Sequence, residues 1–300
     1  MKVLLVGVTG QIGHEIKHEL SSIATVVAPG RDQMDLSHPQ AIAAQVKATA
    51  PDIIINAAAY TAVDQSEAEV TVAQRINGLA PGHLAAAANQ VSAALIHLST
   101  DYVFDGNQSF PYRESDPPAP VSMYGQSKLA GEQAIQTHCD RHLILRTAWV
   151  YGTYGSGNFV KTMLTLGGQR DVVRVVYDQV GTPTWAREVA KVVATLAQRL
   201  DTIPWGIYHF TNSGVASWYD FAIAIFEEAE ALGYPLKMQR VEPITTPEYP
   251  TPAHRPAYSV LANEKIIDVL GYRPPHWRRS LRAMLAEYVP LMVEAGEKFG

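Results

Sequence analysis

The 300-residue chain has one cysteine, Cys139, and no long apolar run. A lone cysteine excludes an intrachain disulfide and a cysteine-based metal cluster, and it fits a reducing compartment. No apolar stretch approaches the roughly 18 residues that a membrane-spanning helix needs. The apolar start, Met1–Gly7, is too short for a signal peptide with a cleavage site. These absences favour a cytoplasmic protein without a membrane partner.

Charge is also limited. The 24 Lys and Arg residues against 29 Asp and Glu give a net charge of -5, which argues against nucleic acid as a partner. The ten histidines show no H-E-x-x-H spacing, so the sequence offers no histidine-based metal motif. Hydrophobic residues make up 47% of the chain, enough for a sizeable core.

Short apolar runs alternate with helical segments over the first half of the chain. The amphipathic segments between the runs predict helices, and the runs predict strands that are buried on both faces. The strand candidates are Val3–Val6, Thr25–Ala28, Asp52–Asn56, Ala93–Leu98 and Leu143–Arg146. This alternation predicts an α/β fold, a Rossmann-type doubly wound parallel sheet.

The regular alternation of apolar runs and helical segments ends after Tyr151. We expect residues 1–150 to form an NAD(P)-binding domain and residues 151–300 a smaller, mainly substrate-binding C-terminal portion. Elements within about 178–212 are expected to return to the main sheet. Five prolines within 243–256 exclude regular helix or a central strand there. A long loop of this kind is usually functional or disordered.

A glycine-rich turn, Gly7-Val8-Thr9-Gly10-Gln11-Ile12-Gly13, stands where the first strand gives way to the first helix. Glycines there allow a tight turn and close approach of a pyrophosphate to the helix N-terminus. The spacing is G-x-x-G-x-x-G rather than the commonest dinucleotide fingerprint. The turn predicts a dinucleotide site, and a ligand-free turn remains the alternative.

The second strand is followed by Arg31 and Asp32, where the adenosine ribose of a dinucleotide would lie. An Arg there accommodates the 2′-phosphate of NADPH, and an acidic residue binds the 2′-hydroxyl of NADH. Arg31 favours NADPH, and Asp32 keeps NADH open. Arg31 could equally be a solvated loop charge.

Tyr124 and Lys128 lie four residues apart in a segment, 121–137, that is predicted to be helical. This spacing puts both side chains on one face. A cation beside a phenol favours the phenolate, so we expect Lys128 to lower the pKa of Tyr124 and make it a usable proton carrier. An exposed helical pair is the alternative.

Four motifs stand together in the order found in one enzyme family. They are the glycine turn, Asn56–Ala59, Ser99–Gly106 and Tyr124-x-x-x-Lys128. On these motifs the chain resembles the extended short-chain dehydrogenase/reductases, from residue 1 to about 290. Further matches to one branch of that family are Asn56–Asp64, Arg146–Tyr151, Asn158-Phe159, Asp178–Pro183 and Tyr249–Pro256.

The resemblance implies reduction of the 4-keto group of dTDP-4-dehydro-β-L-rhamnose by hydride from NAD(P)H, a step toward cell-surface polysaccharide. By resemblance Tyr124 donates the proton, Lys128 holds the nicotinamide ribose, and Thr100, or else Ser99, hydrogen-bonds the keto oxygen. The implied cofactor contacts are Gly7, Gly10, Gln11, Ile12, Gly13, Arg31, Asp35, Leu36, Ala57, Ala58, Ala59, Tyr60, Tyr124 and Lys128. The implied substrate contacts are Thr100, Asp101, Val103, Phe104, Trp149 and Arg255.

Two of the substrate residues have open alternatives, since Trp149 could be a core residue and Arg255 an exposed loop charge. The sugar nucleotide is the expected small-molecule partner, and the chain is expected to be a monomer or a homodimer. Two rival interpretations also stand. One is an NADP-binding regulatory subunit without catalysis, and the other is a sugar-nucleotide epimerase or dehydratase of the same family.

Members of this family can dimerise around Mg²⁺ held by glutamates of both subunits. The matching positions are Glu15, Arg187 or Glu188, and Glu287. Arg187 in the middle position leaves the carboxylate set incomplete, and a hard cation needs several oxygen ligands. We therefore expect no tightly bound metal, with Glu15 and Glu287 as weak candidates only.

Overall fold

The centre of the computed structural model, which describes residues 1–297, is a six-stranded sheet. Its strand order is β10-β5-β4-β3-β1-β2, and every neighbouring pair is parallel. The bounds are β1 (Lys2–Val6), β2 (Thr25–Val27), β3 (Ile53–Asn56), β4 (Ala94–Thr100), β5 (His142–Thr147) and β10 (Gly206–His209). The order reverses between β1 and β3, which makes the sheet doubly wound and leaves a crevice at the carboxyl ends of those strands.

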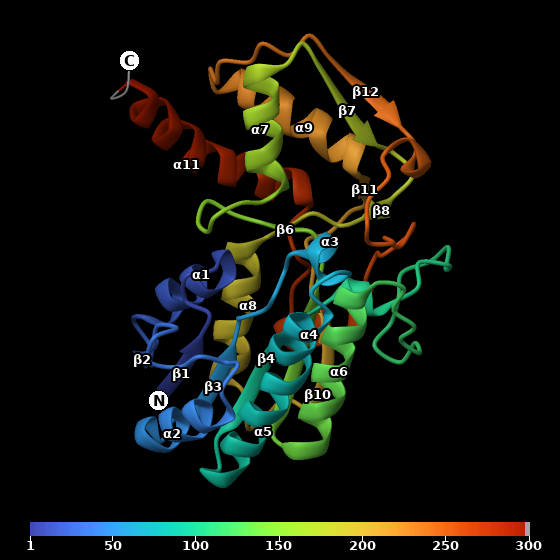
Figure 1. Ribbon diagram of the computed structural model, residues 1–300. Helices are drawn as coiled ribbons and strands as arrows, with labels where there is room; N and C mark the ends of the chain where they lie inside the picture. Colours follow the sequence, from blue (N-terminus) through green and yellow to red (C-terminus); the bar gives the residue numbers. More distant parts are fainter. Residues whose placement is uncertain (298–300) are drawn as a thin grey trace.

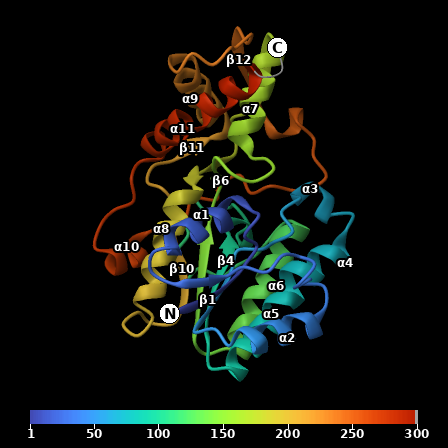
Figure 2. The ribbon, with the colours of Figure 1, turned by 90° about the vertical axis from the view of Figure 1, so that its left-hand side faces the viewer.

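Helices cover both faces of the sheet (Figure 2). Leu5 and its alternate neighbours pack on one face with α1 (Gln11–Leu20) and α8 (Ala186–Gln198). Leu4 and Val6 face the opposite layer. That layer consists of α2 (Pro39–Thr49), α5 (Ala80–Gln90) and α6 (Met123–His138). Because both faces are buried, the strands are apolar throughout rather than alternating, as the sequence predicted.

A second group of elements lies beyond the carboxyl ends of the sheet strands (Figure 1). Its helices are α7 (Phe159–Gln169), α9 (Trp218–Ala231) and α11 (Trp277–Glu297), beside the parallel pair β7 (Val172–Val176) and β12 (Arg240–Ile244). These helices share an apolar core that includes Val160, Phe221 and Leu285. Pro243 lies in β12, which has a partner on one side only, as a strand proline requires.

The remaining helices and strands are short. The bounds are α3 (Val63–Ser66), α4 (Val70–Ala73), β6 (Val150–Tyr151), β8 (Val180–Gly181), β9 (Thr184–Trp185), β11 (Ala216–Ser217) and α10 (Glu264–Leu270). Between residues 70 and 90 the helical path is interrupted, because the chain forms α4, then a π-helical turn at Gln74–Leu79, and then α5. The sequence did not predict α10. None of the helices in the described part is long and apolar enough to cross a membrane.

Two elements from beyond residue 150 belong to the main sheet layer. The strand expected at 207–210 is β10, which pairs with β5, and α8 packs against α1. The division of the chain into domains near residue 150 stays a prediction.

Candidate functional site

The glycine turn packs directly against the loop that follows β3. Gly7 has a φ of +87°, and a Cβ there would lie 2.5 Å from the backbone nitrogen of Ala58. A Cβ on Gly13 would lie 2.1 Å from the carbonyl oxygen of Gly7. Glycine is therefore required at both positions, because only glycine allows this tight turn at the start of α1.

Two hollows meet at this turn. A cleft of about 860 Å³ runs along the carboxyl ends of the strands, and a smaller hollow of about 340 Å³ shares Gly7 and Ala58 with it. The cleft is lined by Gly7, Gly10, Gln11, Ile12, Ala57, Ala58, Ala59, Thr100, Asp101, Tyr124, Lys128, Trp149 and Arg255, among others. A third hollow, about 960 Å³ beside β10 and α10, contains none of the predicted site residues.

The smaller hollow contains the residues expected near adenosine. It is lined by Arg31, Asp35, Leu36 and Tyr60, whereas Asp32 does not line it. The Arg31 side chain is 86% exposed and lies 4.0 Å from the Asp35 carboxylate. Hydrogen bonds from Ser37 lower the pKa of Asp35, with a smaller contribution from Arg31. Of the two residues that bear on cofactor choice, Arg31 alone faces this hollow.

Helix α6 brings Tyr124 and Lys128 to the end of β4. The Ser122 side chain caps the helix, accepting a hydrogen bond from the Gly125 N–H over 3.1 Å. A Cβ on Gly125 would lie 2.1 Å from the carbonyl oxygen of Tyr102, so glycine allows the helix to approach the segment after β4. The rings of Tyr102 and Tyr124 meet edge to face, with centroids 5.7 Å apart. This close approach leaves Tyr124 half-buried beside Thr100 at the cleft.

The expected lowering of the Tyr124 pKa is wrong for this structure. Burial raises the pKa of Tyr124 to about 12, although a hydrogen bond with Thr100 opposes the rise. The Lys128 amine donates to the Leu98 carbonyl over 2.7 Å. Burial also lowers the pKa of Lys128 to about 8. Desolvation is the largest cause of both shifts, because burial disfavours the charged form of each group.

Thr100 and Ser99 point to opposite sides of β4. The Thr100 hydroxyl donates to Asp101 over 3.1 Å and lies at the cleft. The Ser99 hydroxyl instead donates to Glu132, which is buried in an ion pair with Arg146. Both residues line the cleft, but the Ser99 hydroxyl is committed to Glu132, which leaves Thr100 as the residue available to the keto oxygen.

Asp101 is a buried acid at the cleft. Its side chain is 2% exposed, and its Oδ2 atom has no hydrogen-bond partner among residues 1–297. Burial raises the pKa of Asp101 to about 7, although hydrogen bonds from its neighbours oppose the rise. The next two predicted substrate residues differ from it. Val103 and Phe104 are fully buried in a cluster with Tyr112, and neither lines the cleft.

Trp149 forms part of an aromatic wall. Its φ of +47° is rare for a residue other than glycine, and it turns the indole toward Trp218, with ring centroids 3.5 Å apart and planes 2° apart. Phe159 extends the wall, 4.6 Å from Trp218. A Cβ on Gly181 would lie 2.5 Å from the Trp149 ring, which gives the glycine of the Asp178–Pro183 motif a packing role.

Arg255 lies at the cleft, already paired with Asp64. Its two terminal nitrogens contact the two carboxylate oxygens at 3.0 and 2.8 Å. Asp64 also accepts the Ala253 N–H over 3.2 Å. The pair fastens the proline-rich loop to α3, so this part of the loop is ordered by a contact across the cleft.

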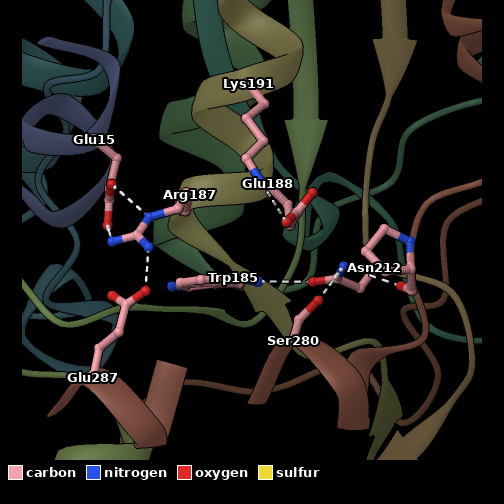
Figure 3. A network of polar contacts seen from close by, with 9 residues as sticks. Glu15, Trp185, Arg187, Glu188, Lys191, Asn212, Ser280 and Glu287 are labelled. Carbon is pink, nitrogen blue, oxygen red and sulfur yellow. Dashed lines mark hydrogen bonds and ion pairs between the residues drawn. The ribbon is translucent and has the colours of Figure 1, made fainter. Parts of the chain in front are cut away.

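The predicted metal positions are joined by an arginine (Figure 3). Arg187 donates to Glu15 at 3.1 and 3.3 Å and also contacts Glu287. Across the described residues, no group of three or more His, Cys, Asp or Glu side chains could hold a metal ion. The guanidinium occupies the space between the carboxylates, so these residues do not fit Mg²⁺.

Sequence reasoning missed the partners of several site residues. Trp218 and Phe159 form the wall with Trp149, Asp64 holds Arg255, and His97 lies 3.3 Å from the Lys128 amine. Asp64 and His97 stand within or next to the quoted motifs, which was the signal available. Nothing local marked Trp218.

The fold and the site together define a class. A doubly wound parallel sheet, a glycine turn at its switch point and a Thr, Tyr and Lys at the same cleft are features of Rossmann-type oxidoreductases that bind NAD(P).

Comparison with known proteins gives the family. The family model described as RmlD substrate binding domain matches residues 1–289. The chain belongs to this family.

Individual relatives cover almost the whole chain. The dTDP-4-dehydrorhamnose reductase of Escherichia coli (strain K12) is 43% identical over 293 residues, which are 96% of this chain and 98% of that protein. The solved dTDP-4-dehydrorhamnose reductase of Clostridium acetobutylicum has a TM-score of 0.89 and 39% identity, covering 97% of this chain and 99% of its own. That of Bacillus anthracis, solved in complex with NADP, has a TM-score of 0.88 and 35% identity, covering 95% and 99%.

Proposed function

We propose that this chain reduces the 4-keto group of dTDP-4-dehydro-β-L-rhamnose to form dTDP-L-rhamnose, a precursor of cell-surface polysaccharide. The observation that carries the proposal is the convergence of Thr100, Tyr124 and Lys128 on the cleft that begins at the glycine turn. Relatives that bear the name dTDP-4-dehydrorhamnose reductase over nearly their full length support the substrate.

The residues present fit NAD(P)H. Gly7 and Gly13 allow a tight turn at the N-terminus of α1, where backbone N–H groups suit a pyrophosphate. The hollow beside Arg31, Asp35 and Leu36 would hold the adenosine end. The exposed Arg31 guanidinium, 4.0 Å from the Asp35 carboxylate, would pair with a 2′-phosphate, so it favours NADPH without excluding NADH.

The bound cofactor supplies a hydride to the keto carbon. Negative charge then develops on the keto oxygen, which needs a proton and hydrogen bonds. Tyr124 donates the proton. Because burial raises its pKa to about 12, the phenol is protonated at neutral pH and acts as an acid. Thr100 donates a hydrogen bond to the same oxygen, and Lys128 holds the nicotinamide ribose.

The substrate would lie between the aromatic wall and the proline-rich loop. Trp149 and Trp218 offer a flat apolar surface for the sugar ring. Arg255 offers a planar cation that matches diphosphate oxygens. Asp64 already pairs with Arg255. A bound diphosphate would therefore share Arg255 with the Asp64 carboxylate or displace that carboxylate.

The rival interpretations have less support. A non-catalytic regulatory subunit has no need for Thr100, Tyr124 and Lys128 to line the same cleft. Dehydratases tend to carry two acids after the catalytic Thr, whereas Asp101 is followed here by Tyr102. The monomer-or-homodimer state and the cytoplasmic location stay predictions.

Turnover tests the proposal directly. The wild-type chain should oxidise NADPH when dTDP-4-dehydrorhamnose is added, measured as loss of NADPH absorbance. Tyr124→Phe should lower kcat by about 10²-fold or more, the contribution typical of a proton donor, with NADPH binding nearly unchanged. Tyr208→Phe is the control, because its hydroxyl donates to the Pro204 carbonyl away from the cleft. Tight NADPH binding without turnover would favour the regulatory interpretation instead.

A further inference from the structure

A short chain of buried polar groups leads from the cofactor cradle to the Lys128 amine. Asn56, at the end of β3, and His97, in β4, are 1% and 0% exposed. The Asn56 amide nitrogen lies 3.0 Å from Nδ1 of His97. On the other side of the ring, Nε2 lies 3.3 Å from Nζ of Lys128. Neither Asn56 nor His97 has a part in the reaction described above.

A backbone N–H determines which atoms donate and which accept in these hydrogen bonds. The Ala58 N–H donates to Oδ1 of Asn56 over 3.1 Å, and a backbone N–H can only donate. Oδ1 must therefore face Ala58, which turns the Asn56 amide donor toward His97. Nδ1 of His97 then accepts, so a neutral His97 carries its proton on Nε2.

The Nε2–H of His97 faces an amine that is better neutral than charged. An ammonium offers three donors and no acceptor, whereas a neutral amine has a lone pair that accepts the Nε2–H. The same amine still donates to the Leu98 carbonyl over 2.7 Å. An imidazolium at His97 is excluded, because its Nδ1–H would face the Asn56 donor. Burial also holds the pKa of His97 well below its usual value.

We propose that Asn56 and His97 are a positioning pair that presents an N–H to Lys128 and so favours its neutral amine form. Lys128 then exchanges a proton near neutral pH instead of remaining a permanent cation. The catalytic meaning of this exchange rests on the proposed function. The assignment of donors and acceptors does not.

The other charged groups around Lys128 leave this arrangement in place. Glu132, one turn further along α6, raises the pKa of Lys128, but its carboxylate is paired with Arg146 at 2.6 Å. Burial dominates and leaves the pKa of Lys128 at about 8. On the cleft side, burial raises the pKa of Tyr124 to about 12, so its phenol is uncharged at neutral pH. Burial raises the pKa of Asp101 to about 7, so its carboxyl is only partly ionised there.

The tautomer of His97 is the first test, and it needs no turnover. Histidine labelled with nitrogen-15 reports in long-range proton–nitrogen spectra which ring nitrogen carries the proton. We expect a neutral His97 with its proton on Nε2, and the signal is assigned by its loss in His97→Gln. A proton on Nδ1, or an imidazolium at neutral pH, overturns the proposal.

Two variants test the effect on Lys128. Asn56→Asp replaces the amide donor with an acceptor, which should draw the His97 proton to Nδ1 and leave Nε2 to accept from a Lys128 ammonium. The pKa of Lys128, followed by labelled-lysine spectra, should rise by about one unit or more. His97→Gln removes the fixed N–H and should also raise it, without adding a charge.

Asn263→Asp is the matched control, because it adds the same charge at a side chain that contacts Thr211 and not Lys128. It should leave the His97 tautomer and the Lys128 titration unchanged. An unchanged Lys128 titration in both Asn56→Asp and His97→Gln overturns the positioning role. If the tautomer is as expected and the wild-type chain does not reduce the keto sugar, only the proposed function fails.

Discussion

Arg187 joins three helices that are far apart in the sequence, and its removal should destabilise the fold. It lies at the start of α8 and contacts Glu15 of α1 and Glu287 of α11 (Figure 3). The Glu15 side chain is 2% exposed, that of Glu287 is 41% exposed, and that of Arg187 is 23% exposed. Loss of Arg187 should therefore destabilise the fold mainly because it leaves the buried Glu15 carboxylate unpaired.

The magnitude follows from this asymmetry. Removing one partner of a buried ion pair costs about 3–5 kcal/mol, because the other charge is left unpaired. Exposed pairs are worth about 1 kcal/mol or less. Because Arg187 is partly exposed, we expect Arg187→Met to lower the free energy of unfolding by about 3 kcal/mol, the lower end of the buried range. Glu287→Gln should lower it by about 1 kcal/mol or less.

Urea unfolding measures these free energies. Variants are compared only where the dependence of the unfolding free energy on urea concentration, the m-value, is unchanged. The decisive variant is the double change Glu15→Gln with Arg187→Met, which removes both charges. It should be more stable than the sum of the two single effects predicts, by about 2 kcal/mol, within the range of coupling between contacting residues. Additive single effects would refute the argument. If a chelator lowers the stability of the wild type, a structural metal is present and our expectation of no bound metal is wrong.

Three further predictions concern the cleft. Arg31→Ala should raise KM for NADPH about 10-fold and leave KM for NADH nearly unchanged, because one charge-assisted contact is lost; an unchanged ratio of the two removes Arg31 from cofactor choice. Arg255→Ala should raise KM for the sugar nucleotide far more than that for NADPH, and equal effects would contradict the diphosphate assignment. The pKa of Asp101 rises from 3.8 to about 7 on folding, so the folded chain keeps a proton that the unfolded chain loses between these values. Stability should therefore fall as pH rises through that window, and Asp101→Asn should flatten this slope in urea unfolding at several pH values.

Much of the fold could be read from local patterns. The apolar runs predicted the first five strands, and the glycine turn predicted the junction of β1 and α1, because burial on both faces and a tight turn each leave a local signature. Sequence-based prediction was weakest where a distant pairing or packing element decides the local structure. Strand β7 (Val172–Val176) pairs with β12 outside the main sheet, a partner that no local pattern identifies. A helix-like pattern around Asn77 conceals a π-helical turn.

The sequence by itself determined which chemical groups are present and which of them share a local element. Tyr124 and Lys128 share one face of a helix because they are four residues apart. Thr100 ends a strand because an apolar run precedes it. The tertiary structure decided how those groups behave. Desolvation by the surrounding elements raises the pKa of Tyr124, against the effect expected from Lys128 alone.

Long-range partners were likewise a tertiary matter. Asp64 and Arg255 stand 191 residues apart, and Glu15 and Arg187 stand 172 apart. No local pattern specifies such pairs, because they form only when the packing of whole layers brings distant helices and loops together. The sequence therefore determined a Rossmann-type sheet carrying a Thr, a Tyr and a Lys, and packing decided their protonation, their partners and the walls of the cleft.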